Sequence, residues 1–313
     1  MPLLLLMMLT LLVLPPADAI PCDGYWLVEE SDSGDYSALD VAALGFQTNR
    51  SVCTNADNSL AGKAVSLERY LNASHAQVTL AMQTHLLPKV RSGAATTQLV
   101  IQDLESPKGI HPRHYGELNA TQLARVVTAT KLRLQVAREL MPRAGLALYA
   151  TAVNSTAAAI AGYKRAAALG LWDAPLTHLA PVLYTGPGMH GGTLASSVRE
   201  RLDASIQIVP SDGRQLPLAP LLSWRMFGAG SKADCAVSET NLANDLADIR
   251  AWDQAHPGRI TALQWWSGSD HDFDGENATD SGCAAPHLSY LQWLTAARIV
   301  PKSCLPPPQK TSY

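Results

Sequence analysis

Asp103 and Glu105 follow a short apolar run, and their type and spacing suit acid–base chemistry. The apolar residues 99–101 predict a buried parallel strand, which Pro107 ends. Because side chains alternate along a strand, both acids should face the same side as residues 99 and 101. Two carboxylates roughly 6–7 Å apart at the C-terminal end of a buried strand are typical of an α/β catalytic site.

The chemistry that this pair suits best is glycoside hydrolysis assisted by the substrate. An ordinary retaining glycosidase needs a second carboxyl group about 5–5.5 Å from the acid, across the scissile bond. The ends of the other strands that the sequence predicts, given below, carry no such carboxyl group. We therefore expect Glu105 to protonate the leaving oxygen while an N-acetyl group of the substrate attacks the anomeric carbon. Asp103 would orient that group and stabilise the positive charge that develops.

A regular alternation of strands and helices positions the two acids. The predicted strands cover 99–105, 145–150, 178–185, 218–227 and 259–266, and the helices cover 121–141, 156–168, 193–204, 239–255 and 287–298. Asn119 is the expected cap of the first of these helices. Five such units imply parallel strands with helical crossovers. No G-x-G-x-x-G follows a strand, which argues against a dinucleotide-binding fold.

We predict an α/β fold, a (β/α) barrel of the TIM type with seven or eight parallel strands. Residues 25–28 and 42–46 are the candidates for the opening strands. Residues 67–87 should be helical with an interruption near 72–74, and Pro88 should end that helix. The alternative is an open doubly wound sheet.

The other predicted strand ends carry aromatic and polar side chains: Tyr149, Tyr184, Arg225 and Trp266. In a barrel, the C-terminal strand ends hold the functional residues. A sugar suits this lining, because its C–H faces stack on aromatic rings while its hydroxyl groups need donors and acceptors. Trp265 and Trp266 must face opposite sides, and Trp266 shares its side with the polar Gln264. We therefore place Trp266 at the site.

The segment LVIQDLESP, preceded by HLLP, resembles the catalytic strand of secreted hyaluronidases and, more distantly, of chitinases, where a D-x-E pair ends a barrel strand. The order of four later segments is similar to that family as well: 137–142, 146–149, 181–184 and 266–269. The resemblance implies that Glu105 is the acid and Asp103 its helper. It also implies that Tyr184 contacts the acetamido group and that Trp266 lies under the reacting sugar.

These observations predict a hyaluronidase-like glycoside hydrolase that cleaves glycans containing N-acetylhexosamine with retention of configuration. It should act as a monomer, without cofactor or metal, and its partner should be the glycan substrate. The alternative is a non-catalytic glycan-binding or scaffold protein on the same barrel. In that case Asp103 and Glu105 would form a structural pair, capped by a side chain such as Arg225.

Residues 1–19 predict a secretory signal peptide, because residues 3–14 are mostly apolar and ADA precedes Ile20. A membrane anchor would need about 20 apolar residues. Residues 20–304 would form a single barrel domain, and 305–313 a disordered, Pro-rich tail. We therefore expect a secreted, extracellular protein that does not bind a membrane.

Five N-x-S/T sequons fit this route and predict a glycoprotein: Asn49, Asn72, Asn119, Asn154 and Asn277. The five cysteines predict disulfides in an oxidising compartment. We expect the pairs Cys235–Cys283 and Cys22–Cys53.

The composition argues against two other classes of protein. The net charge is −3 and no basic cluster occurs, so nucleic acid is not an expected partner. The chain contains neither C-x-x-C nor H-E-x-x-H, which argues against a metal site. Residues 270–275, DHDFDG, resemble the start of a calcium loop, but Ser281 stands where the bidentate Glu should be. A solvated acidic loop is the preferred interpretation.

Overall fold

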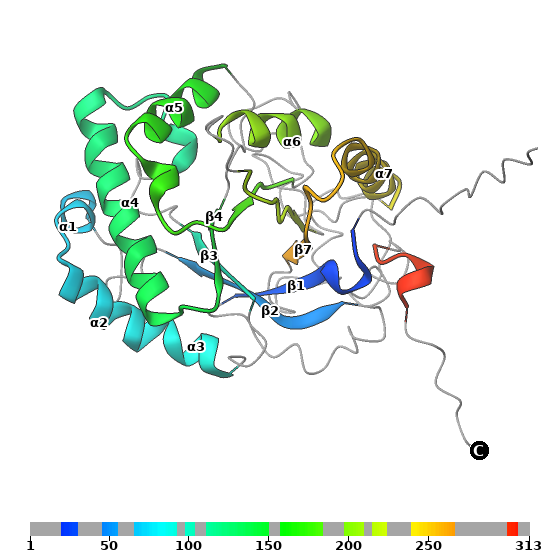
Figure 1. The fold of residues 1–313 in the computed structure, drawn as a ribbon, viewed down its shortest axis with the longest axis horizontal. Helices are drawn as coiled ribbons and strands as arrows, with labels where there is room; N and C mark the ends of the chain where they lie inside the picture. Colours follow the sequence, from blue (N-terminus) through cyan, green and yellow to red (C-terminus); the bar gives the residue numbers. More distant parts are fainter. Residues whose placement is uncertain are drawn as a thin grey trace, which may run out of the picture.

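The computed structural model describes residues 20–30, 46–55, 66–92, 98–103, 111–149, 157–183, 197–209, 215–223, 239–266 and 299–305. Its strands lie at the centre and its helices lie outside them (Figure 1). The strands are β1 (Tyr25–Glu30), β2 (Gln47–Asn55), β3 (Leu99–Asp103), β4 (Gly145–Tyr149), β5 (His178–Ala180), β6 (Leu221–Ser223) and β7 (Leu263–Trp266).

The seven strands form one parallel sheet in the order β5-β4-β3-β2-β1-β7-β6. Its two edges meet, because parallel bridges join Leu179 to Leu218 and Val182 to Leu221. The Leu183 amide also donates to the Leu221 carbonyl at 2.8 Å. The strands therefore follow one another around a ring, linked at β5 and β6 by bridges instead of a continuous ladder. This confirms the predicted (β/α) barrel, with seven strands in the ranges that the structure describes, and argues against the open doubly wound sheet.

The helices in the described ranges are α1 (Leu67–Leu71), α2 (His75–His85), α3 (Leu87–Ser92), α4 (Ala120–Leu140), α5 (Ala157–Ala168), α6 (Val198–Gln207) and α7 (Glu239–Ala255). Ser74, Asn119 and Ser197 fix the starts of α2, α4 and α6, each through a complete capping box. The predicted cap at Asn119 is thus confirmed. None of the described helices has the length and apolar character needed to cross a bilayer.

The ring encloses one set of buried side chains, the interior cluster: Trp26, Cys53, Leu99, Ile101, Ala147, Ala180, Val182, Ala219, Leu221 and Ala262. A larger cluster between the strands and the helices includes Val100, Leu146 and Leu148. Along β3, residues 99 and 101 face the interior and residue 100 faces the helices, as alternation requires. The predicted side of Leu99 and Ile101 is therefore confirmed.

A hydrogen-bonded polar pair crosses the ring interior. The Ser51 hydroxyl of β2 donates to Oε1 of Gln264 in β7, and Gln264 Nε2 donates to the Ala219 carbonyl at 2.6 Å. Both polar side chains are fully buried, which is tolerable because each is hydrogen-bonded. Trp265, in contrast, packs in the outer cluster. The structure thus confirms that Gln264 and Trp265 face opposite sides of β7.

Two features of the N-terminal half differ from the prediction. The strand that follows β1 in the described residues is β2, residues 47–55. Of the predicted strand 42–46, only Phe46 is described, directly before β2, and 42–45 lie outside the described residues. The β2 sequence, QTNRSVCTN, is too polar to be recognised as a barrel strand. Its buried Ser51 is accommodated by the hydrogen bond to Gln264. Pro88 lies in the first turn of α3 instead of ending a helix. The N–H groups of a first turn have no partner within the helix, so proline, which has no N–H, is tolerated there.

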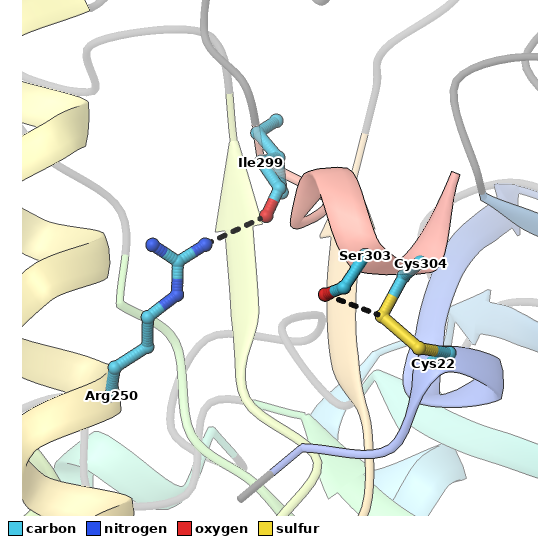
Figure 2. Close-up of a disulfide and its surroundings, with 5 residues drawn as sticks. All are labelled: Cys22, Arg250, Ile299, Ser303 and Cys304. Atoms are coloured by element: carbon cyan, nitrogen blue, oxygen red, sulfur yellow. Dashed lines mark hydrogen bonds between the residues drawn. A yellow bond between two sulfur atoms is a disulfide. The ribbon is translucent and has the colours of Figure 1, made fainter. Parts of the chain in front are cut away.

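The disulfide differs from the prediction as well. Cys22 pairs with Cys304, so the expected Cys22–Cys53 bond is wrong (Figure 2). Cys53 points instead into the ring interior from β2. The bond joins η1 (Cys22–Gly24), just before β1, to η7 (Lys302–Cys304) near the end of the chain. The pair Cys235–Cys283 lies outside the described residues.

Breaking this disulfide should destabilise the barrel. It closes a loop of 282 residues, and removing such a constraint from the unfolded chain typically costs about 2–4 kcal/mol. We expect Cys22→Ser to lower the free energy of unfolding by that amount in denaturant titrations under oxidising conditions. Cys22→Ser/Cys304→Ser should match the single variant, since each lacks the same bond. If Cys22→Ser unfolded with the same denaturant midpoint as the wild type, the pairing would be contradicted.

Candidate functional site

Asp103 is the last residue of β3 and stands at the C-terminal ends of the strands, which we call the mouth of the ring. It follows Ile101 of the interior cluster by two positions, so alternation directs it to the interior side. Its side chain is half-buried, and oxygen Oδ1 is shielded from solvent. The predicted helper carboxylate thus has the expected place on the strand.

The other predicted residues are described only in part. Glu105, Tyr184 and Arg225 lie outside the described residues, and Glu105 follows Asp103 by two positions in the sequence. The Trp266 backbone completes β7, where it pairs with Val28 and Ser223, while its side chain is outside the described part.

Tyr149 is the residue that the structure brings beside Asp103. It is the last residue of β4 and packs against the interior cluster. Gln102 and Leu148 are paired across β3 and β4, so Asp103 and Tyr149 are the next positions on the two strands. Neighbouring strands lie about 4.8 Å apart, and both residues belong to the interior side. A carboxylate and a phenol therefore stand next to each other at the mouth.

His111 is a site residue that sequence analysis missed. It lies just before η4 (Pro112–His114), and its side chain is only 2% exposed. Its ring meets the Tyr149 ring edge-on, with 6.5 Å between centroids, and the His114 ring at 6.2 Å. His114 Nδ1 in turn lies 3.1 Å from Oε2 of the exposed Glu117. A row of polar rings thus runs from the mouth towards the surface.

The turn that carries His111 is fixed against α5 by two glycines. A Cβ on Gly162 would clash with the backbone of Gly116, so the helix and the turn touch through their main chains. Tyr115 is fully buried and meets Tyr163 edge-on at 5.6 Å. Burial also raises the pKa of the Tyr115 phenol, which keeps it neutral. The sequence signal for this turn was the spacing His111-x-x-His114 behind the acidic strand.

This arrangement provides a half-buried carboxylate and a half-buried phenol at the mouth, with a buried imidazole against the phenol ring. Such groups can accept and donate hydrogen bonds to hydroxyl and amide groups, and the rings can stack on the C–H face of a sugar. Within the described ranges, no three His, Cys, Asp or Glu side chains are grouped as metal ligands. The acidic segment 270–275 lies outside those ranges.

No family model and no curated protein sequence matches the chain. Among solved structures, bee venom hyaluronidase in complex with a hyaluronic acid tetramer is similar at 12% identity and a TM-score of 0.53, over 81% of this chain and 88% of that one. An endo-1,4-beta-xylanase from Caldicellulosiruptor owensensis is 10% identical with a TM-score of 0.48, over 78% and 84% of the two chains. At this identity the likeness to the hyaluronidase is one of fold, and it agrees with the TIM-type barrel.

The contact between Gly162 and Gly116 predicts the effect of one methyl group. Gly162→Ala should lower the free energy of unfolding by about 1–3 kcal/mol, because the added carbon forces the turn away from α5. An alanine in a helix ordinarily stabilises it, so a loss would be informative. Thermal and denaturant unfolding measure the change. Ala161→Ser, at the neighbouring exposed position, should lose no more than the roughly 0.5 kcal/mol by which serine is the poorer helix former. A stabilised Gly162→Ala variant would contradict the close packing.

Proposed function

We propose that this protein is a retaining glycoside hydrolase that cleaves glycans containing N-acetylhexosamine. The observation that carries the proposal is the place of Asp103, at the mouth, facing the interior beside Tyr149. Glu105 follows two positions later in the sequence. The hyaluronidase of similar fold was solved with a hyaluronic acid tetramer, which supports a glycan of this class as the substrate.

In the proposed mechanism the substrate supplies the nucleophile. Glu105 donates a proton to the glycosidic oxygen, and the bond from that oxygen to the anomeric carbon breaks. The acetamido oxygen of the same sugar forms the new bond to the anomeric carbon, which gives a cyclic cation. Asp103 accepts the acetamido N–H and balances the positive charge. Glu105 then takes a proton from water as the water oxygen bonds to the anomeric carbon and the bond from that carbon to the acetamido oxygen breaks. Two inversions leave the configuration retained.

Tyr149 would bind the sugar beside the acids, with the buried His111 ring behind it. The Tyr149 ring provides an apolar face, its hydroxyl a donor and acceptor, and the edge-on contact of His111 fixes the orientation of that ring. Tyr184, Trp266 and Arg225 are proposed as further sugar contacts, with Tyr184 at the acetamido group. The enzyme would act as a monomer and without a cofactor.

Secretion belongs to the same proposal. Residues 1–19 would direct the chain to the secretory route and be removed. The Cys22–Cys304 disulfide supports this route, because structural disulfides are rare in reducing compartments. A hydrolase of extracellular glycans would meet its substrate there.

The hydrolase is tested by removing each acid. We expect Glu105→Gln to lower kcat by about 10²–10⁴-fold, as for a lost general acid, and Asp103→Asn by about 10²–10³-fold. Release of reducing ends from hyaluronan, chondroitin and chitin oligomers measures turnover. Glu139→Gln, an exposed change on α4, is the matched control and should act as the wild type. Unchanged turnover in Glu105→Gln would overturn the assignment.

A non-catalytic glycan-binding protein is the second candidate. It is favoured by the aromatic lining, which binds sugars without any need for an acid. It predicts that Glu105→Gln and the wild type bind the same oligosaccharides equally and that neither hydrolyses any of them. Calorimetric titration of both proteins with each oligosaccharide separates the two candidates.

Tyr149 should contribute to substrate binding more than to the chemical step. Tyr149→Phe removes the hydroxyl and keeps the ring, so one hydrogen bond of about 0.5–1.5 kcal/mol is lost, or roughly 2- to 12-fold in KM. Tyr149→Ala removes the ring as well and should raise KM further. Initial rates over a range of oligosaccharide concentrations measure KM and kcat separately. A KM in Tyr149→Ala equal to that of the wild type would remove Tyr149 from the site.

A further inference from the structure

Asn72 lies in the turn that joins α1 to α2. Its side chain is exposed, and its amide nitrogen Nδ2 donates to Glu68 Oε2 at 3.1 Å, also at the surface. Ser74, the third residue of the sequon, is exposed and caps α2 through its hydroxyl oxygen. Both positions that an N-glycosyl transferase must recognise are therefore at the surface, in a segment outside regular structure.

Asn119 is exposed as well and has a structural role that a glycan would leave intact. Its side-chain oxygen Oδ1 accepts the Gln122 amide at 2.9 Å and so caps α4. N-linked sugars attach to Nδ2, which the cap does not use. Thr121, the third residue of this sequon, is exposed in the first turn of α4. The Asn119 sequon is therefore open, and its cap is compatible with modification.

Asn49 is in a different position. It lies in β2, in the irregular stretch between Gln47, which pairs with Trp26 of β1, and Ser51, where pairing with β3 begins. The third residue of its sequon, Ser51, is fully buried in the ring interior and donates its hydroxyl to Gln264. A hydrated oligosaccharide two residues before Ser51 would oppose the insertion of β2 between its neighbours.

We propose that the fold selects among the sequons: Asn72 and Asn119 carry N-linked glycans, and Asn49 does not. The proposal depends on passage through the secretory route and is independent of the proposed hydrolase activity. The Cys22–Cys304 disulfide supports that route.

The modification is a transfer from a lipid-linked oligosaccharide diphosphate. Nδ2 of the acceptor asparagine bonds to the anomeric carbon of the oligosaccharide and loses one proton, which balances the negative charge gained by the leaving diphosphate. The bond between that carbon and the phosphate oxygen breaks, and the lipid diphosphate leaves. The modified nitrogen keeps one N–H, so at Asn72 the hydrogen bond to Glu68 can persist.

The two glycans would stand on one side of the molecule. α1 and α4 lie next to each other at the outer layer (Figure 1). Arg125 of α4 holds Glu68 of α1 through two hydrogen bonds, of 2.8 and 3.2 Å. Asn72 follows Glu68 by one helical turn, and Asn119 precedes Arg125 by less than two turns. The carbohydrate would therefore cover this pair of helices.

The test is secretion of the full chain from a eukaryotic cell line, followed by mass spectrometry of the peptides that contain residues 49, 72 and 119. Peptide N-glycosidase in heavy-oxygen water labels each occupied asparagine as it becomes aspartate. We expect label at positions 72 and 119 and none at 49. On gels, Asn72→Gln and Thr121→Ala should each remove one glycan step, and Asn49→Gln should remove none.

Two controls separate glycosylation from folding. Ser74→Thr keeps both the sequon and the helix cap, so it should keep the glycan at Asn72. Asn119→Asp removes the acceptor nitrogen but keeps the capping oxygen, so it should lose one glycan and still be secreted. Label at Asn49 in secreted protein would overturn the proposal, as would its absence at Asn72 or Asn119, or an unlabelled chain that stays in the cell.

Discussion

The meeting of β5 and β6 is the contact on which the rest of the structure depends. Each of these strands is only three residues long, yet parallel bridges at 179–218 and 182–221 bring the two edges of the sheet together. Without them the strands would form a curved open sheet. Because the edges meet, the C-terminal ends of the seven described strands share one mouth, and in the strand order Asp103 on β3 stands across the ring from β6 and β7.

The narrow ring imposes a second constraint, on side-chain size and polarity. Ala147 of β4, Ala180 of β5 and the alanines that precede β6 and β7 share the interior with Trp26 and the two apolar residues of β3, so small and large side chains pack together there. The buried polar pair Ser51 and Gln264 is tolerated because each group has a hydrogen-bond partner. Asp103 and Tyr149, on the same side, end β3 and β4 at the mouth, where both are half-buried.

Much of the fold could be predicted because the local sequence of β3, β4, α4 and α5 shows their structure. The buried strands are apolar runs, and the helices have apolar residues at 3.6-residue spacing. β2 could not, because its polar sequence is explained only by Gln264, more than 200 residues away. Asp103 was found from strand alternation alone. His111 was missed, since its place against Tyr149 is a tertiary contact of a loop residue that no periodicity indicates. The disulfide was missed because spacing carries no information on pairing over 282 residues.

The Cys22–Cys304 bond has a mechanical consequence. β1 already lies beside β7, so the first and last parts of the barrel are neighbours before any covalent link is made. The disulfide turns the polypeptide between them into a closed covalent loop. A pulling force applied at the two ends of the chain would therefore pass through the sulfur atoms and bypass every strand. The barrel would carry that load only after chemical reduction.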